Sequence, residues 1–374
     1  MEKKKILLVS RSFYPTISPR SFRTTELVKE FARQGHSVTL ITVKNDQYHI
    51  PFEQKYGVII NDFGPLRFPS VKPSTNKNMI HGIAWKTQRV FQLLFEYPDI
   101  EIMFRLKKAL ANERGYDLLI SIAVPHPVHW GVAWAWREEN PIAKTWAADC
   151  GDPYMGFDID RIKKPFYFKY LEKMFCRKAD YITVPFEAAK KAYYSEFRKK
   201  IKVIPQGFNF EVVKNGVERL HPNGIPKLAY AGNLWGGGRN PDELLNYLVN
   251  LDRDFKFTIY TQNKSPVIPY LNKANNRIKL REYIPREQLL EELSTMDFLV
   301  NLENQTTSQL PSKIVDYYLT GRPILSVPSS GMNTKTINRF LDGDYSDRLI
   351  VNNIDQYRIT NVCSQFLNLC GKNA

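Results

Sequence analysis

Apolar runs and amphipathic segments alternate along most of the chain. Residues 5–10, KILLVS, contain a short continuous apolar run, as is typical of a strand buried on both faces of a sheet. Residues 22–35 then place apolar side chains at helical spacing and end at Gly35, and residues 36–43 form a second apolar run. A strand, a helix and a strand in this order predict a βαβ unit, and therefore a parallel sheet with right-handed crossovers.

The same alternation continues to residue 328 and falls into two successive series, divided near residue 205. We therefore expect an α/β protein with two Rossmann-like, doubly wound parallel-sheet domains that face a cleft. The first domain is expected over 1–205 and the second over 206–354, with a helix at about 355–374 that packs back on the first. Further strands are expected over 116–124, 143–150, 179–185, 202–208, 226–234, 256–261, 278–284, 297–302 and 322–328, and further helices over 186–197, 240–251, 285–296 and 311–321.

Composition narrows the class of protein. The chain has 374 residues, of which 43% are hydrophobic and 24% charged, so a disordered chain or a disulfide-stabilised miniprotein is excluded. Its four cysteines form no Cys-x-x-Cys pair, which disfavours a zinc knuckle and fits a reducing cytoplasm. We expect no signal peptide, because Arg11 interrupts the first apolar run. We also expect no transmembrane span, because Pro125 and Pro127 interrupt the apolar stretch 118–136.

The net charge of +15 is distributed unevenly. Residues 1–110 carry 18 Lys+Arg against 9 Asp+Glu, and residues 161–202 carry 13 against 4, whereas residues 111–160 carry 3 against 8. The first 202 residues thus hold +13 of the total. Such an excess indicates either that this half meets a polyanion or an anionic membrane, or that it has a solvated lysine-rich surface.

One candidate site lies where a polar loop leads into the helix predicted over 311–321. Ser312 and Lys313 stand in the first turn of that helix, where free N–H groups and a lysine charge could bind a phosphate or diphosphate. Asp316 follows three residues after Lys313, on a neighbouring part of the helix surface, and could accept hydrogen bonds from ribose hydroxyls. The alternative is a surface helix with an ordinary ion pair.

Two further loops follow predicted strands. In residues 230–241, Gly232 and Asn233 end a strand and a triple-glycine loop leads to Arg239, which could hold a phosphate, although a flexible connector would look the same. In residues 146–157, Asp149 and Asp152 could bind sugar hydroxyls or take a proton, or could cap a helix. The second loop lacks further metal ligands.

The basic first half contains two more candidate regions. Arg20 and Arg23 lie near the start of the first predicted helix and could point into the cleft, as could His129, or could lie on the surface. Residues 78–95 predict an amphipathic helix with Trp85, Lys86 and Arg89 away from its apolar side. Such a helix either packs on a domain core or lies in an anionic membrane interface.

Taken together, these segments resemble bacterial glycosyltransferases of family 4, which have the GT-B fold. The resemblance covers nearly the whole chain and includes SPRSFRTTELVKEFARQGHSVTLITV, DCGDPY, KVIPQGF, LAYAGNL and LPSKIVDYYLTGRPIL. The last of these is similar to the branch that builds capsule, O-antigen and related surface polysaccharides. The resemblance implies retaining transfer of a sugar from a nucleotide-sugar donor on the second domain to an acceptor on the first, with no metal and no other cofactor.

The resemblance also assigns roles to individual residues. It places Asp316 at the ribose-binding position, Arg239 with the diphosphate, and Tyr283 and Ile284 beside the nucleotide base. The family has two glutamates eight positions apart where this chain has Ser308 and Asp316, so Ser308 or Gln309 would take over the sugar contacts of the first. It implies no particular nucleophile, and Asp149 and Asp152 stay the candidates for catalysis. The donor-binding prediction as a whole is Gly232, Asn233, Arg239, Tyr283, Ile284, Ser308, Gln309, Ser312, Lys313 and Asp316.

The predicted function is therefore a cytoplasmic enzyme, peripheral on the inner face of the cell membrane, that acts on a polyprenyl-pyrophosphate-linked or growing glycan. Two alternatives stay open at this point. One is an epimerase of the same fold that uses a nucleotide sugar without an acceptor. The other is a non-catalytic basic protein that binds nucleic acid or a transferase partner, although no recognition helix, RNA-binding aromatic signature or zinc finger supports nucleic-acid binding.

Overall fold

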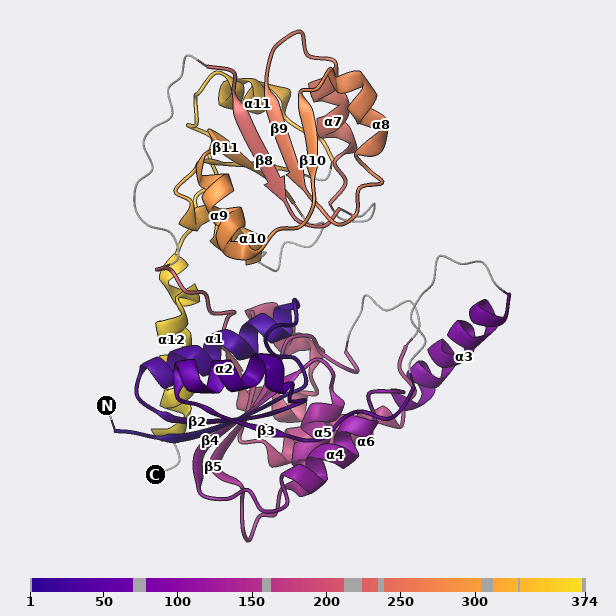
Figure 1. Cartoon of the computed structure of the whole chain (residues 1–374), viewed down its shortest axis with the longest axis vertical. Helices are drawn as coiled ribbons and strands as arrows, with labels where there is room; N and C mark the ends of the chain where they lie inside the picture. Colours follow the sequence, from indigo (N-terminus) through magenta and orange to yellow (C-terminus); the bar gives the residue numbers. More distant parts are fainter. Residues whose placement is uncertain are drawn as a thin grey trace. The chain divides into compact units, whose positions relative to one another are not determined.

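A computed structural model of the chain contains two compact units (Figure 1). The first comprises residues 1–208 and 356–374, and the second comprises residues 209–355. The structure describes residues 2–69, 79–156, 163–211, 224–234, 239–303, 312–328 and 330–371; the side chains of residues 79–82 and 312 are outside that description. All strand pairs in both units are parallel, so the chain is an α/β protein with two doubly wound sheets, as the sequence predicts.

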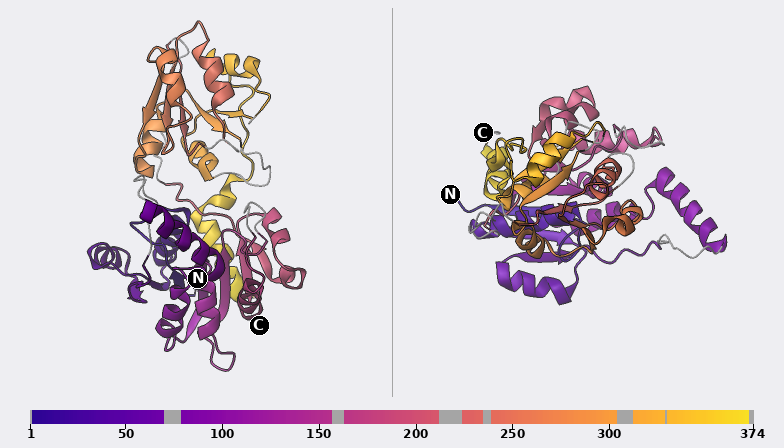
Figure 2. Two further views of the ribbon diagram at one scale, coloured as in Figure 1. Left: turned by 90° about the vertical axis from the view of Figure 1, so that its right-hand side faces the viewer. Right: turned by 90° about the horizontal axis from the view of Figure 1, so that it is seen from above.

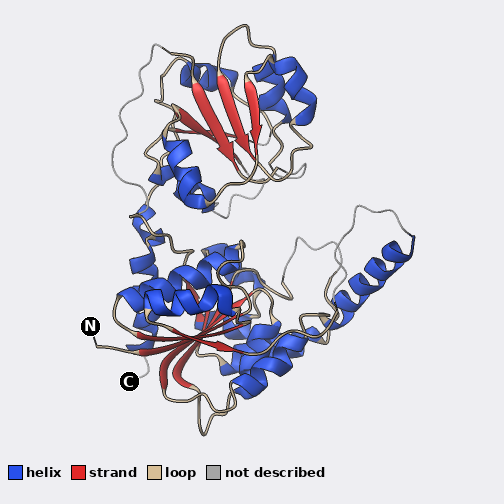
Figure 3. Ribbon diagram, viewed as in Figure 1, coloured by secondary structure: helices blue, strands red, loops and turns tan. Residues whose placement is uncertain are grey.

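The first sheet has the strand order β3-β2-β1-β4-β5-β6-β7, and helices cover both of its faces (Figure 3). Its strands are β1 (Lys5–Ser10), β2 (Ser37–Thr42), β3 (Ile59–Asp62), β4 (Tyr116–Ala123), β5 (Ala143–Cys150), β6 (Tyr181–Val184) and β7 (Ile201–Val203). Its helices are α1 (Pro19–Arg33), α2 (Asp46–Tyr56), α3 (Met79–Phe95), α4 (Glu101–Ala109), α5 (Pro127–Ala135), α6 (Phe168–Lys178) and α12 (Ile359–Leu367).

The alternation of side chains along β1 explains why this sheet needs two helical layers. Ile6 and Leu8 enter one core with residues of α1 and α12, while Leu7 and Val9 enter the other with residues of α4 and α5. A strand that is apolar on both sides has to be covered on both sides. The start of α1 is fixed locally, because the Ser18 side chain accepts a hydrogen bond from the Ser21 N–H and Pro19 occupies the first turn.

The chain returns to the first unit after completing the second. Phe208 and Arg358 form a parallel bridge there, and the Phe208 N–H donates to the Tyr357 carbonyl at 2.8 Å. Val362, Cys363 and Phe366 of α12 then pack with α1 in the core of the first unit. In Figures 1 and 2, α12, in yellow, runs along this unit.

The second sheet has the strand order β10-β9-β8-β11-β12. Its strands are β8 (Lys227–Ala231), β9 (Lys256–Tyr260), β10 (Ile278–Arg281), β11 (Phe298–Leu302) and β12 (Ile324–Val327), and its helices are α7 (Asp242–Val249), α8 (Ile268–Leu271), α9 (Arg286–Ser294), α10 (Ser312–Leu319) and α11 (Thr334–Leu341). The strands that follow β8 build one side of the sheet and those that begin with β11 build the other. The carboxyl ends of β8 and β11 therefore meet at the switch point, where ligands of such sheets bind.

One predicted helix is wrong. Instead of a helix over 186–197, the structure has two short 3-10 helices, Glu187–Ala192 and Ser195–Lys200. Tyr193 between them has extended backbone, and Tyr193 and Phe197 are buried in the core of the first unit. The helix is therefore interrupted where these two rings enter the core.

Glu172 on α6 is completely buried in the first unit. Its Oε1 accepts a long hydrogen bond of 3.4 Å from the Met155 N–H, and Oε2 has no hydrogen-bond partner among the described residues. Burial raises the pKa of Glu172 to about 7, although the Met155 and Tyr154 N–H groups oppose the shift.

We expect this carboxyl to make the first unit less stable as the pH rises. Between the unfolded pKa of 4.5 and about 7, the folded protein keeps a proton that the unfolded chain has lost, so stability falls with pH by up to about 3 kcal/mol. Glu172→Gln should remove this term, and urea denaturation should find the variant stabilised relative to wild type more at pH 8 than at pH 5. Glu187→Gln, at an exposed position, is the control. A difference from wild type that is the same at both pH values would contradict the prediction.

Candidate functional site

The turn that follows β8 has backbone that only glycine adopts easily. Gly232 has φ +147°, and a Cβ built there would lie 3.2 Å from the Tyr230 hydroxyl. The Gly232 N–H donates to the Tyr260 carbonyl on β9, and the Tyr230 hydroxyl donates to the Asn233 carbonyl. These contacts fix the peptide groups of residues 232 and 233 at the carboxyl end of β8.

Two cations converge beside this turn. Lys313 in the first turn of α10 donates to the carbonyl of Leu302, the last residue of β11, at 3.2 Å, and its Nζ lies 4.7 Å from the centre of the Tyr230 ring. Arg239 hydrogen-bonds the hydroxyl of Tyr230. Burial, and then the nearby charge of Arg239, lower the pKa of Lys313 well below its usual range. Among the described residues no carboxylate pairs with Lys313, so an anion there would relieve the repulsion between the two cations.

Asp316, the predicted ribose ligand, lies one turn further along α10. Its Oδ1 accepts a hydrogen bond of 2.8 Å from Nε of Arg286, the first residue of α9, and lies 2.7 Å from a terminal nitrogen of the same guanidinium as an ion pair. Burial raises the pKa of Asp316, and the ion pair with Arg286 opposes the shift. Oδ2 has no donor within the described part of the chain. Nothing in the sequence marks Arg286, because thirty positions separate it from its partner.

The remaining donor-site predictions are placed only in part. Tyr283 and Ile284 lie in the connection between β10 and α9, where Tyr283 is exposed and Ile284 packs against the core of the second unit. Ser308 and Gln309 fall outside the described residues, as do the loop 235–238 and the side chain of Ser312. The structure therefore brings together Gly232, Asn233, Arg239, Lys313 and Asp316.

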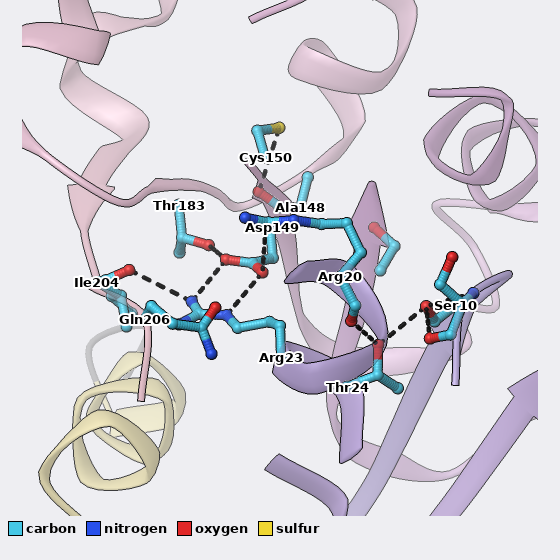
Figure 4. A network of polar contacts seen from close by, with 12 residues as sticks. Ser10, Arg20, Arg23, Thr24, Ala148, Asp149, Cys150, Thr183, Ile204 and Gln206 are labelled. Atoms are coloured by element: carbon cyan, nitrogen blue, oxygen red, sulfur yellow. Dashed lines mark hydrogen bonds and ion pairs between the residues drawn. The ribbon is translucent and has the colours of Figure 1, made fainter. Parts of the chain in front are cut away.

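In the first unit, Asp149 at the end of β5 lies in a buried ion-pair network (Figure 4). Arg23 of α1 donates to its Oδ2 at 3.0 Å and to its Oδ1 at 2.8 Å, and the Thr183 hydroxyl of β6 donates to Oδ1 at 2.7 Å. Both members of the Arg23–Asp149 pair are only 3% exposed. Burial alone would raise the pKa of Asp149, but Arg23, Arg20 and Thr183 together hold it below its usual value. In this arrangement the carboxylate of Asp149 joins α1 to the sheet and is shielded from solvent.

Arg20 approaches the same carboxylate from α1, at 3.9 Å, and is more exposed than Arg23. Its guanidinium lies against Gly151, where an added Cβ would come within 2.4 Å of the Arg20 Cζ. Asp152, the next residue in this loop, is exposed and stays a candidate for the first unit's part of the chemistry. Arg20 and Asp152 are thus the two predicted polar residues that reach solvent here.

His129 does not lie at an exposed edge. It is completely buried on α5, where its Nδ1 is 2.8 Å from the Ser121 hydroxyl and its Nε2 is 3.4 Å from the Cys150 sulfur. Burial lowers the pKa of His129 to about 3, which keeps the ring neutral. As placed here, this side chain belongs to the core and cannot contact an acceptor.

The sequence profile of Glycosyltransferase Family 4 matches residues 22–212, just over half of the chain. The chain belongs to this family. No curated protein sequence matches this glycosyltransferase.

Solved structures share the fold of this enzyme over almost its whole length. A glycosyltransferase from Rickettsia africae has a TM-score of 0.59 at 13% identity, with all of both chains covered. The lipopolysaccharide outer core galactosyltransferase WaaB and HepE from Anabaena in complex with UDP-glucose each have a TM-score of 0.59 at 12% identity, with 98% of both chains covered. These similarities show the GT-B fold, with its two parallel-sheet units.

Helix α3 of the glycosyltransferase leaves its apolar side in solvent. Figures 1 and 2 show it projecting from the body of the first unit. Six of its large apolar side chains are 40–58% exposed, namely Ile83, Trp85, Val90, Phe91, Leu94 and Phe95, whereas Leu93 is half-buried. Lys86 and Arg89 are exposed on the same helix. These six side chains therefore do not pack on the domain core, which was one of the two interpretations of this segment. Within the described ranges, no helix combines the length and the apolar character needed to cross a membrane.

Proposed function

We propose that this family 4 glycosyltransferase transfers a sugar, with retention of anomeric configuration, from a nucleotide-sugar donor on the second unit to a lipid-linked or growing glycan acceptor on the first. The pathway would be bacterial surface polysaccharide synthesis, such as that of capsule or O-antigen. The observation that carries the proposal is the pair of cations, Lys313 and Arg239, beside Tyr230 at the switch point between β8 and β11.

The donor would bind along this switch point. Lys313 and Arg239 would hold the diphosphate together with the N–H groups at the start of α10 and in the Gly232–Asn233 turn. Asp316 would accept from a ribose hydroxyl, Tyr283 and Ile284 would border the base, and Ser308 or Gln309 would contact the sugar. HepE, which shares the fold, is known in complex with UDP-glucose, and this supports a nucleotide sugar as the donor class.

Sugar transfer breaks the bond between the anomeric carbon and the diphosphate oxygen and forms a bond from that carbon to an acceptor hydroxyl oxygen. The departing diphosphate gains negative charge, which the two cations would stabilise without the need for a metal ion. In a front-face reaction, the proton of the acceptor hydroxyl passes to the leaving diphosphate, so no protein nucleophile is needed. A reaction without a protein nucleophile is consistent with the first unit, where both carboxylate oxygens of Asp149 already accept hydrogen bonds from Arg23.

The direct test is a thermal-shift panel of UDP, GDP, dTDP and ADP sugars and of CMP sugars, followed by a transfer assay. A donor that binds only the folded protein raises the melting temperature. We expect one nucleotide to do so with wild-type protein, and the matching sugar nucleotide to label a glycan or polyprenyl-pyrophosphate-linked acceptor. If no sugar nucleotide binds, or if crystals soaked with them show the switch point filled by packed side chains, the proposal fails.

The same enzyme would sit on the inner face of the cell membrane, and the surface of the first unit around α3 supports this. Helix α3 contains no acidic residue, and Glu172, the only one in α6, is completely buried. The start of α6 touches the end of α3, because the Tyr167 hydroxyl donates to the Leu94 carbonyl. Phe166 and Tyr170 beside it are 70% and 60% exposed, and the Lys169 Nζ lies within 6 Å of both rings. Exposed aromatic and basic side chains fit an anionic lipid surface, and the described residues of α3 and α6 add no exposed carboxylate to them.

We expect the protein to bind vesicles that contain phosphatidylglycerol and not vesicles of phosphatidylcholine alone, with binding weakened by salt. Lys86→Glu combined with Arg89→Glu should reduce the binding at least tenfold, because each basic residue near the surface contributes about 1 kcal/mol. Lys279→Glu with Lys335→Glu makes the same change in net charge on exposed positions of the second unit and should have little effect. Vesicle sedimentation measures both. Equal binding to vesicles with and without phosphatidylglycerol would contradict the proposed electrostatic contribution to membrane binding.

A further inference from the structure

The last residue of β8 lacks a strand neighbour on one side. All five residues of β8 pair with β9, but only Leu228 and Ala229 pair with β11. The Gly232 N–H points to β9, where it donates to Tyr260. Because the N–H and C=O groups of successive residues in a strand face opposite edges, those of Ala231 face the β11 side, where β11 no longer pairs with β8.

The Tyr317 side chain of α10 supplies the hydrogen bonds that a paired strand would otherwise make. The Ala231 N–H donates to the Tyr317 hydroxyl at 2.7 Å, and the same hydroxyl donates to the Ala231 carbonyl at 3.2 Å. Tyr317 is 1% exposed and Ala231 is also buried, so water does not compete for these groups. One hydroxyl thus satisfies both polar groups of a buried peptide position.

These bonds connect the two halves of the proposed donor site. On the β8 side, Ala231 is followed directly by the Gly232–Asn233 turn. On the α10 side, Tyr317 follows Asp316 and lies one helical turn after Lys313. The Tyr230 ring completes the connection from the β8 side, because it lies under Lys313 and its hydroxyl contacts Asn233 and Arg239.

We infer that Tyr317 is a positioning residue, whose hydroxyl sets the distance between the Gly232 turn and the first turn of α10. It touches no substrate itself. Its role rests on the proposed function, because the groups that it aligns are those proposed to hold the donor diphosphate. A nucleoside monophosphate has one phosphate fewer to place between the two segments. The alignment should therefore matter more for a diphosphate than for a monophosphate.

The test compares Tyr317→Phe with wild type. UDP, GDP, dTDP and ADP are titrated by calorimetry, and the strongest ligand is then compared with its own monophosphate. We expect Tyr317→Phe to weaken the diphosphate about tenfold, the effect of losing one hydrogen bond of about 1.4 kcal/mol, and to change the monophosphate less than threefold. Hydrogen exchange of the peptide that contains residues 228–234 should become faster in the variant.

Tyr260→Phe is the matched control. It removes the hydroxyl of another buried tyrosine of the same unit, and that hydroxyl bonds Glu292 of α9 and not the β8 turn. It should lower the melting temperature to a similar degree without changing the ratio of the two affinities. If Tyr317→Phe lowers the melting temperature but leaves both the ratio and the exchange of residues 228–234 unchanged, Tyr317 is only a core residue and the inference is wrong. If wild-type protein binds none of the four diphosphates, the proposed function fails and the inference fails with it.

Discussion

Replacing Lys313 by methionine should weaken nucleoside diphosphate binding about ten- to a hundredfold. A charged hydrogen bond to phosphate contributes about 1.5–3 kcal/mol, and methionine keeps an apolar stem over the Tyr230 ring while it removes the charge. Arg239→Ala should have an effect of similar size, because both cations are proposed to hold the same diphosphate. Calorimetric titration of the nucleotide selected by thermal shift measures the loss, and Lys279→Ala, at an exposed position of the same unit, controls for net charge.

Lys313→Met should be at least as stable as wild type. Burial and Arg239 lower the pKa of Lys313, which means that its charged form is disfavoured in the unliganded protein. A melting temperature equal to or above that of wild type, together with weaker nucleotide binding, would mark Lys313 as a binding residue held at some cost to stability. Unchanged affinity in both Lys313→Met and Arg239→Ala would eliminate the proposed donor site.

Loss of the Asp149 carboxylate should give the largest loss of stability. Asp149→Ala leaves the guanidinium of Arg23 buried without its partner, and breaking a buried ion pair in this way costs about 3–5 kcal/mol. In a unit of this size that corresponds to a fall in melting temperature of about 8–15 °C. Thermal unfolding followed by circular dichroism measures it, and Asp152→Ala, an exposed acid in the same loop, should change the melting temperature little.

A double variant separates the ion pair from simple packing. Arg23→Met combined with Asp149→Leu removes both charges and keeps apolar volume, so it should recover part of the stability that Asp149→Ala loses. If Asp149→Ala proves as stable as Asp152→Ala, the network in Figure 4 contributes little and Asp149 becomes available again as a catalytic candidate.

The central strands of both sheets were predictable from local pattern because they are buried on both faces, whereas the edge strand β3 was not predicted. Runs such as KILLVS and YDLLISIA read as strands whichever helices cover them. Helix α2 was not predicted, since Pro51 within it interrupts a helical pattern. The hydrophobic pattern also could not predict that residues 186–197 divide into two 3-10 helices, because this depends on how the Tyr193 and Phe197 rings pack in the core.

The sequence indicates individual residues of the candidate site more readily than it indicates which side chains pair with them. Glycine after a strand and a lysine at a helix start can be recognised locally, so Gly232 and Lys313 could be proposed from the sequence. The partners of Asp149 and Asp316 could not be, because Arg23 is 126 positions away from one and Arg286 is 30 positions away from the other. The periodicity of α3 is the same whether its apolar side meets a core or solvent, so only the structure could show that side exposed.

The return of the chain to the first unit has a consequence for synthesis on the ribosome. The sheet of residues 5–203 cannot cover its α1 side until α12 has been translated, because Val362, Cys363 and Phe366 complete that core. Residues 209–355 contain every strand of the other sheet and can fold while they emerge. The N-terminal half should therefore finish folding last, and a nascent chain that stops before residue 359 should still recruit chaperones through the uncovered face.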